Sequence, residues 1–420
     1  MGYALGFVFI ALLVLSVPVG IAIALSSIVG IQFFSSIPME IVAQRLVSGI
    51  SSYSLLAIPL YVFAGSLMNA GGITQRLVGF AKAIVGPVRG GLAQTTIITT
   101  AVFGGISGSQ VADTTSVGRL MIPQMVQAGY DRRYSASLMA TAGGIFLTIP
   151  PSINLIVYGV LAQVSISDLF FYGLIIGLAT VLLLMVGAYF FAIVEKHPKG
   201  ERQSVKQIWT SFRRAFFSLM LPVVIIGGIR IGVFTPTEGG AVAVLFAVLI
   251  GLVVHREMNV RKFLSAALDS AVLVGVIMLI IAAAQIYSYA LVTGGIPQAI
   301  TALLLGITEN PLVILLLINV ILLLVGAVME GNAAMIVFVP IILPVALAVG
   351  IDPLHLGLVI VLNLGIGLIT PPVGLCLMVA TTIARTTVQR VLPAIVPWFI
   401  ICLVLLAAVT YLPPLFGWFY

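Results

Sequence analysis

Two groups of polar residues interrupt otherwise apolar stretches of this sequence and could bind a small ion. The first group follows a Gly-Gly pair and consists of Ser107, Ser109 and Gln110. The second group consists of Glu330, Gly331 and Asn332. Hydroxyl, amide and carbonyl oxygens are hard ligands, which suit Na⁺ and are poor ligands for soft metals. The residue types therefore indicate cation binding.

Each polar group is followed, further along the chain, by a pair of consecutive prolines. The prolines are Pro150-Pro151 and Pro371-Pro372. Their polar neighbours are Ser152 and Asn154 after the first pair, and Asn363 and Thr370 before the second. Proline lacks an N–H and disfavours helix at the preceding residue, so nearby carbonyls lose their helical partners. We predict two oxygen-lined cages, and half-helix N-termini pointing into the gap would favour an anion.

Close helix packing is the alternative explanation for such residues, because small side chains let membrane helices approach one another. Glu330 is the hardest residue to explain in this way, since an ionisable group at membrane depth is costly. A protonated or paired structural carboxyl remains its alternative role. Arg119 could bind an anionic substrate, or extend its side chain to the cytoplasmic surface.

The two groups belong to two copies of one pattern. Gly129-Tyr-Asp131 matches Gly350-Ile-Asp352 at an offset of 221 residues, and the two proline pairs have the same offset. Upstream, Gly71-Gly72-Ile73 matches Gly294-Gly295-Ile296 at an offset of 223. Internal repeats with interrupted apolar helices are typical of membrane transporters.

The composition is that of a membrane-embedded protein. Of the 420 residues, 61% are hydrophobic and 7% are charged, whereas soluble domains carry about 25% charged residues. The length allows roughly ten to twelve passes or re-entrant segments. Basic residues in short loops account for the net charge of +7, so we expect lipid rather than nucleic acid as a partner. No catalytic or nucleotide-binding motif is present, which disfavours an enzyme or an ATP-driven pump.

The repeat predicts an all-α polytopic protein in two halves. The predicted segments are a first repeat (1–194) with a re-entrant hairpin at about 91–131 and a broken helix at 134–165, a cytoplasmic basic linker (195–215), and a second repeat (216–420) with a hairpin at about 311–350 and a broken helix at 354–384. An odd number of passes separates equivalent elements, so the repeats should be inverted. Segment 294–309 contains no Lys or Arg, as expected of an outward-facing segment.

Three smaller expectations concern the connecting segments. Residues 3–34 form either one broken helix or a tight helical pair, and the corresponding part of the second repeat favours the pair. Residues 35–52 should be a loop. Residues 73–90 carry Arg76, Lys82 and Arg89, and this spacing predicts an amphipathic helix on the membrane surface.

Four segments together carry a resemblance to a known family. They are Gly104–Asp113 (GGISGSQVAD), Ala128–Asp131 (AGYD), Ala140–Ser152 (ATAGGIFLTIPPS) and Asn363–Gly374 (NLGIGLITPPVG). Over nearly its whole length the chain resembles the large membrane subunit of tripartite ATP-independent periplasmic (TRAP) transporters, of the DctM and SiaM type, in the ion transporter superfamily.

The resemblance implies a Na⁺-coupled elevator in the bacterial inner membrane, in which a transport domain holding both hairpins slides past a fixed scaffold. It implies uptake of an organic acid such as a C4-dicarboxylate or sialic acid, without an organic cofactor. It further implies two protein partners, a small four-helix membrane subunit and a periplasmic substrate-binding protein. A stand-alone secondary transporter of the same superfamily is the alternative, and a channel is a third class.

Site residues follow from the polar groups and the resemblance together. The first Na⁺ site is expected at Ser107, Ser109, Gly144, Ile149 and Pro151. The second Na⁺ site is expected at Gly326, Glu330, Gly365 and Thr370. Substrate contacts are expected at Ser109, Gln110, Ser152, Asn154, Glu330 and Arg119. The family often has an acidic residue, frequently Asp, at the position of Glu330.

Overall fold

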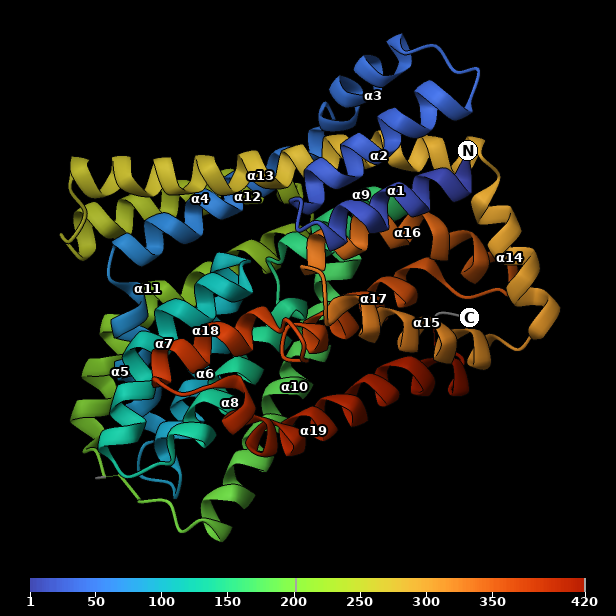
Figure 1. Cartoon of the computed structure of the whole chain (residues 1–420). Helices are drawn as coiled ribbons and strands as arrows, with labels where there is room; N and C mark the ends of the chain where they lie inside the picture. The colour runs from blue at the N-terminus through green and yellow to red at the C-terminus, as the bar shows by residue number, and fades with distance from the viewer. Residues whose placement is uncertain (201, 419–420) are drawn as a thin grey trace.

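The computed structural model describes residues 1–200 and 202–418, with the side chains of all of them except Tyr3, Ile106 and Ser107. The described residues form helices and turns, and only an isolated bridge between Arg89 and Lys199 has strand-like pairing among them. Within this part of the chain, eight helices are long and apolar enough to cross a membrane. The prediction of an all-α polytopic membrane protein is therefore confirmed (Figure 1).

The first half of the chain contains ten α-helices that end at the basic linker. They are α1 (Gly2–Val14), α2 (Val19–Phe34), α3 (Glu40–Ile50), α4 (Ala57–Ala70), α5 (Ile73–Val85), α6 (Gly91–Ser107), α7 (Gln110–Gln127), α8 (Arg132–Ile145), α9 (Ile153–Ala162) and α10 (Ile166–Val194).

The second half repeats this order with longer helices at its start. They are α11 (Val205–Arg230), α12 (Pro236–Leu249), α13 (Val260–Thr293), α14 (Ile296–Ile307), α15 (Pro311–Gly326), α16 (Gly331–Ala348), α17 (Pro353–Gly367), α18 (Leu375–Ala384) and α19 (Val388–Leu415).

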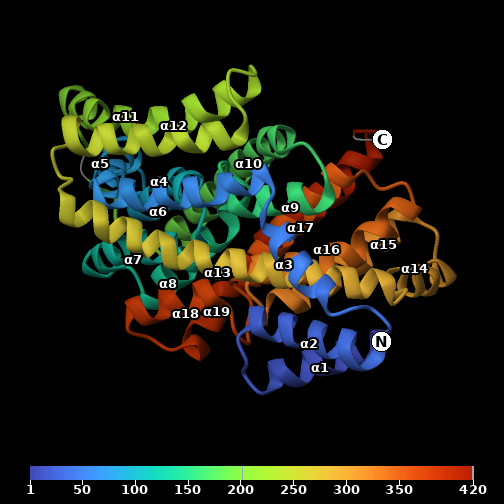
Figure 2. The same ribbon diagram turned by 90° about the horizontal axis from the view of Figure 1, so that it is seen from above.

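Residues 3–34 form two helices, α1 and α2, which pack against each other. The expected loop at 35–52 is wrong, because α3 occupies most of it. This helix is amphipathic and packs on α13, where the Arg45 guanidinium lies 4.5 Å from the centre of the Tyr289 ring. Together α3 and α4 correspond to the single 34-residue helix α13 of the second half. In Figure 2, α13 crosses the molecule between α1–α2 and α4.

The segments predicted as hairpins each consist of two helices joined by a short bend. The first bend places Gly108 in the left-handed region (φ 63°), and Ser109 precedes the first turn of α7. The second bend ends at Glu330, whose carboxylate accepts a hydrogen bond from the N–H of Ala333 and so caps α16. Ser109 and Glu330 are 221 residues apart, so they hold equivalent positions in the two copies.

The two proline pairs break the helices at the expected places. Both Pro150-Pro151 and Pro371-Pro372 have a cis peptide bond. The first pair separates α8 from α9, and the second separates α17 from α18. The broken helices pack on each other, α8 against α18 and α17 against α9. The two broken helices thus form a common core next to the hairpin bends.

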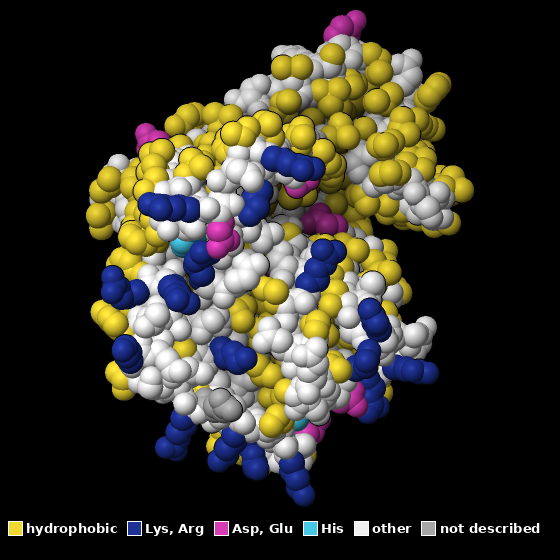
Figure 3. Space-filling model, turned by 90° about the vertical axis from the view of Figure 1, so that its left-hand side faces the viewer, with side chains coloured by type: hydrophobic (Ala, Val, Ile, Leu, Met, Phe, Trp, Pro, Cys, Tyr) yellow, Lys and Arg dark blue, Asp and Glu magenta, His cyan; other side chains and the backbone are white. Residues whose placement is uncertain are grey.

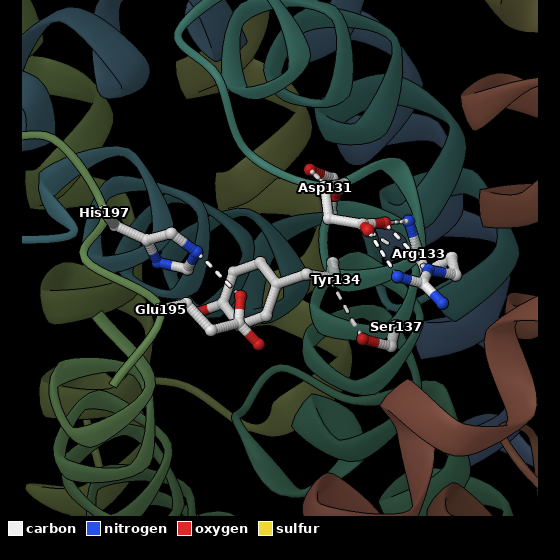
Figure 4. A network of polar contacts seen from close by, with 7 residues as sticks. Asp131, Arg133, Tyr134, Ser137, Glu195 and His197 are labelled. Atoms are coloured by element: carbon white, nitrogen blue, oxygen red, sulfur yellow. Dashed lines mark hydrogen bonds and ion pairs between the residues drawn. The ribbon is translucent and has the colours of Figure 1, made fainter. Parts of the chain in front are cut away.

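The basic linker begins with a docked histidine (Figure 4). The buried ring of His197 lies 4.2 Å from the Tyr130 ring and 4.6 Å from the Tyr134 ring, measured between ring centres. Its Nε2 lies 2.9 Å from Oε2 of Glu195. Burial lowers the pKa of His197, and the neighbouring Glu195 partly opposes this. The linker therefore attaches to the corner between α7 and α8 before α11 begins at Val205.

Basic side chains and exposed apolar side chains gather on different parts of the surface. Figure 3 shows Lys and Arg side chains spread over the side of the molecule where α5 and α11 lie in Figure 1, with hydrophobic side chains covering its upper part. Long helices also expose large apolar side chains, such as Leu182, Val186 and Phe190 on α10 and Leu264, Leu268 and Val272 on α13. Exposed apolar faces of this extent suit lipid rather than water.

Candidate functional site

A cavity of about 440 Å³ contains residues from both hairpin bends. The first bend contributes Gly108, Ser109 and Gln110, and the second contributes Glu330, Asn332 and Ala333. The sequence predicted an oxygen-lined cage at each bend, and the structure brings both bends to one cavity between the broken helices and α13.

The remaining walls of the cavity are almost entirely apolar. They comprise Pro18, Val19, Gly20 and Ile21 at the start of α2, Leu273, Val276, Ile277, Leu279 and Ile280 on α13, and Val111, Ile153 and Leu368. The α13 residues lie near the middle of a helix that runs from Val260 to Thr293. Since α13 is long and apolar enough to cross a membrane, the cavity lies at the level of the middle of this candidate span.

Glu330 is the one ionisable side chain among the cavity-lining residues that the structure describes. Its Oε1 accepts a hydrogen bond from Asn332 Nδ2 at 2.9 Å, and its Oε2 accepts one from the N–H of Ala333 at 3.1 Å. The Oδ1 of Asn332 is buried and has no hydrogen-bond partner. No Lys, Arg or His is found among the cavity-lining residues that the structure describes. A cation that pairs with the Glu330 carboxylate must therefore be a bound ion and not a side chain of the described lining.

The first bend presents uncharged groups to the same cavity. Ser109 is half-buried and Gln110, the first residue of α7, is buried. The side chain of Ser107, a predicted ligand of the first Na⁺ site, lies outside the described residues. A Cβ added to Gly105 would lie 2.9 Å from the carbonyl oxygen of Pro150. The bend therefore packs directly on the first proline pair.

Three polar side chains around that proline pair have buried atoms without a hydrogen-bond partner. The atoms are Thr148 Oγ1, Ser152 Oγ, and both Oδ1 and Nδ2 of Asn154. Each of these residues is at most 1% exposed. Leaving a buried polar atom unpaired costs about 1–3 kcal/mol, so each of these atoms calls for an explanation, and a bound ion is one. The three oxygens are the ligand type that Na⁺ requires.

Asn154 also connects the two copies. A Cβ built on Gly331 in the second bend would lie 3.5 Å from Asn154 Oδ1, so this oxygen approaches the start of α16. Ser152 and Asn154 were predicted to contact substrate, and the structure places them beside the lining residue Ile153, behind the cavity wall. Thr148 was not predicted. At the 221-residue offset Thr370 matches Ile149 and not Thr148, so the only signal for Thr148 was its place two residues before Pro150.

The predicted glycine ligands serve close helix contact. A Cβ on Gly365 would lie 2.8 Å from the Gly144 carbonyl oxygen, and one on Gly144 would lie 3.0 Å from the Gly365 carbonyl oxygen. These residues were assigned to different Na⁺ sites, yet they face each other across α8 and α17. Gly326 is equally close to α17, since its added Cβ would lie 3.1 Å from Cα of Gly367.

The remaining backbone around the proline pairs is already hydrogen-bonded in part. The N–H of Ile149 donates to the carbonyl of Phe146 at 3.2 Å. Thr370 is half-buried, and its Oγ1 donates to the Ile366 carbonyl at 2.7 Å. The carbonyl of Ala327, in the second bend, accepts a hydrogen bond from the N–H of Val373 at 3.1 Å. Each bend thus packs on the proline pair of its own copy.

Asn363 and Arg119 lie outside the cavity lining. Asn363 Nδ2 donates to Asn319 Oδ1 at 2.8 Å, and Asn319 Nδ2 donates to Thr410 Oγ1 at 2.9 Å, which joins α15, α17 and α19. Arg119 is exposed on α7, about 14 Å along the helix axis from the bend by the helical rise. The surface role that the sequence left open for Arg119 fits this position better than substrate contact.

The arrangement defines a class of protein: a polytopic membrane transporter with paired bends around a central cavity. Two solved structures share the fold. The chain aligns with the Alcanivorax borkumensis YdaH transporter with a TM-score of 0.69 at 12% identity, covering 99% of each chain. It aligns with Neisseria gonorrhoeae MtrF, described among antimetabolite efflux pumps, with a TM-score of 0.61 at 14% identity, covering 96% of this chain and 93% of MtrF.

Sequence comparison identifies the family. Residues 7–415 match the model of the tripartite ATP-independent periplasmic transporter, DctM component. The chain is 38% identical to the C4-dicarboxylate TRAP transporter large permease protein DctM of Pseudomonas aeruginosa, covering 93% of this chain and 92% of that protein. It is 37% identical to the sialic acid TRAP transporter large permease protein SiaM of Vibrio cholerae, covering 94% and 93% respectively.

A further relative is longer than this chain. The isethionate TRAP transporter permease protein DctMQ of Oleidesulfovibrio alaskensis is 38% identical over 96% of this chain, which spans 64% of that protein. The chain belongs to the DctM family of TRAP transporter large permeases. It is therefore a multi-pass transporter subunit of the inner membrane and not an enzyme, and the resemblance read from the sequence is confirmed.

Proposed function

We propose that this chain is the Na⁺-coupled membrane subunit that imports an organic acid. The observation that carries the proposal is the set of unpaired oxygens of Thr148, Ser152 and Asn154 beside the cavity that both bends share. A cation coordinated by several of these oxygens would remove the free-energy cost of burying them unpaired. The same cation would offset the charge of Glu330 and so admit an anion.

In this proposal Na⁺ is the coupling ion, which is transported together with the substrate. The first site comprises Ser109, the three unpaired oxygens and backbone carbonyls between Gly144 and Pro151. The second comprises Glu330, Thr370 and backbone near Gly326 and Gly365. No group of three or more His, Cys, Asp or Glu side chains occurs in the described part of the chain, and oxygen ligands of this kind are consistent with Na⁺.

The anion would bind where helices begin. The N-termini of α2, α7 and α16 all contribute residues to the cavity. The first N–H groups of a helix have no partner within the helix, and the helix dipole favours a negative charge there. Relatives named for C4-dicarboxylate, sialic acid, isethionate and 2,3-diketo-L-gulonate support an organic acid as the substrate class.

The elevator mechanism and the inverted repeats belong to the same proposal. The stretch from residue 263 to residue 384 contains no Lys or Arg, although it includes the second hairpin and its broken helix. The first hairpin is flanked by Arg89, Arg132 and Arg133. Under the positive-inside rule, this asymmetry supports a first hairpin that opens to the cytoplasm and a second that opens outward.

Partners follow from the family description, which specifies a tripartite transporter. We propose a small four-helix membrane subunit, and a periplasmic protein that delivers the substrate. A stand-alone transporter of the same superfamily is the second candidate. Na⁺ is the coupling ion in both cases, with no organic cofactor.

Reconstitution tests the proposal. The chain is placed in proteoliposomes alone and with its proposed partners, and uptake of labelled organic acids is measured with and without an inward Na⁺ gradient. Ser109→Ala and Glu330→Gln should lower Na⁺-dependent uptake while the amount of inserted protein stays constant. Unchanged Na⁺ dependence in both variants would contradict the ion sites. Full uptake by the chain alone would favour the stand-alone transporter.

A further inference from the structure

The residues that line the cavity indicate a narrower class of substrate. This inference depends on the proposed function. We infer that the transported anion is a monocarboxylate with an apolar body and a hydroxyl group, and not a dicarboxylate. The observations are the charge inventory of the cavity, its apolar walls, the uncapped start of α2, and the unpaired oxygen of Asn332. Relatives named for C4-dicarboxylate would suggest a different substrate.

The charges in the cavity limit the substrate to one carboxylate. Glu330 is the one ionisable side chain among the described lining residues, and it is acidic. A second carboxylate on the substrate would be buried beside this carboxyl group without a basic side chain to pair with it, and an unpaired buried charge is costly. Proteins that bind dicarboxylates usually supply arginine, whose fork pairs with carboxylate oxygens. The described lining has none.

One helix start remains available for the single carboxylate. The start of α16 is capped by Glu330, and Asp113 lies in the first turn of α7. By contrast, α2 has no acidic residue in its first turn and no side-chain cap. Its first residues, Val19, Gly20 and Ile21, line the cavity. Their N–H groups are therefore the donors that best suit a carboxylate.

The walls require an apolar body. Ile21 comes from α2, and α13 presents Leu273, Val276, Ile277, Leu279 and Ile280. Burying a branched aliphatic group against such a wall gains roughly 25 cal/mol for each Å² removed from water. A polar sugar acid or a short dicarboxylate would leave its hydroxyl or carboxylate groups unpaired there.

The hydroxyl group follows from Asn332. This residue lines the cavity, is 8% exposed, and its Oδ1 is buried without a partner while its Nδ2 donates to Glu330. Because Nδ2 is held by the carboxylate, Oδ1 can only accept. A substrate hydroxyl would donate to it, and a site built for such a hydrogen bond discriminates against analogues that lack the donor.

The test uses three matched acids on the purified full-length chain in lipid nanodiscs with saturating Na⁺. The acids are 2-hydroxyisocaproate, 4-methylpentanoate, which lacks only the hydroxyl, and malate, which replaces the branched chain with a second carboxylate. Affinity is measured by calorimetry and by the shift in unfolding temperature. We expect 2-hydroxyisocaproate to bind at least tenfold more tightly than malate and about threefold more tightly than 4-methylpentanoate.

Variants assign these preferences to residues. Asn332→Leu should abolish the preference for the hydroxyl, because it removes the acceptor. Glu330→Gln should reduce discrimination against malate, because it replaces the acidic group beside which the second carboxylate would be buried with a neutral amide. Arg119→Gln is the matched control, since it removes a charge outside the cavity, and it should leave all three affinities unchanged. The unfolding temperature of each variant without ligand establishes that it is folded.

The possible outcomes separate this inference from the proposed function. Malate binding as tight as that of 2-hydroxyisocaproate overturns the substrate class and leaves Na⁺-coupled import in place. Stabilisation by Na⁺ without binding of any of the three acids also overturns the substrate class. A chain that responds to neither Na⁺ nor any organic acid contradicts the proposed function itself.

Discussion

The two hairpin bends share a backbone design and differ in chemistry. In each, a short non-helical turn ends one residue before a helix that starts at the cavity, at Gln110 in the first copy and at Gly331 in the second. The residue before the helix is Ser109 in one copy and Glu330 in the other. The two bends therefore lie at matching places in the sequence pattern, whereas the ionisable group of the described cavity lining comes from the second bend alone.

The proline breaks show the same division. The first break is surrounded by unpaired oxygens, including those of Thr148 and Ser152. Near the second break, Thr370 Oγ1 donates to the Ile366 carbonyl and Asn363 Nδ2 donates to α15, while Asn363 Oδ1 is buried without a partner. The first break thus has three side chains with unpaired oxygens, and the second uses most of its polar side-chain atoms to hold helices together.

The contact between the copies should tolerate substitution least. Gly365→Ala would place a Cβ 2.8 Å from the Gly144 carbonyl oxygen, and backbone cannot move aside as a side chain can. We expect a loss of about 1–3 kcal/mol in stability, measured as a lower unfolding temperature in detergent. The control is Gly275→Ala on α13, where nothing lies within 4 Å of the added Cβ. Equal effects of the two substitutions would mean that α8 and α17 are not in this contact.

The asparagines distinguish the binding copy from the packing copy. Asn154→Leu removes two unpaired buried atoms, so we expect unchanged or higher stability without Na⁺ together with a loss of Na⁺-dependent uptake of about tenfold, equivalent to about 1.4 kcal/mol. Asn319→Leu removes paired atoms, and should instead lower stability by about 1–3 kcal/mol. Unfolding temperature and uptake measured on both variants test the contrast. Loss of stability in Asn154→Leu would show that this residue is structural.

Exchanging the residues at the bends tests whether charge or position determines ion binding. Glu330→Ser makes the second bend resemble the first and retains a residue type that can cap α16. We expect Na⁺ affinity to fall about threefold to tenfold, or roughly 1 kcal/mol, which is the scale of one net hydrogen bond. The Na⁺ concentration for half-maximal uptake gives the measurement. Restoration of this value in Ser109→Glu combined with Glu330→Ser would mean that either bend can carry the charge.

Much of the fold was predictable because it depends on local signals. Proline pairs, Gly-Gly bends and the 221-residue offset identified the breaks and the bends from the sequence. What could not be predicted depends on long-range packing. The sequence does not show that α13 and the start of α2 close the cavity, that Gly144 meets Gly365, or that Asn363 pairs with Asn319. Residues 35–52 were misjudged because α3 is stabilised by its contact with α13.

The smallest expected effect concerns the linker, whose His197 docks on Tyr130 and Tyr134 of the first copy. The pKa of His197 is lowered from 6.5 chiefly by burial, so the folded protein binds its proton less readily than the unfolded chain. Stability from this group is therefore complete above about pH 6.5 and falls as the pH decreases toward the folded-state pKa. The unfolding temperature of the wild-type chain should fall between pH 7.5 and pH 5.5.

His197→Phe isolates the contribution of the linker, because an aromatic ring can still occupy the space beside Tyr130 and Tyr134 (Figure 4). The variant should lose less stability than the wild type over the same pH interval. A residual slope is expected from His255, whose pKa is also lowered, first by burial and then by Arg76. An identical pH dependence in both proteins would show that His197 titrates normally, and that the linker is not docked on the corner between α7 and α8.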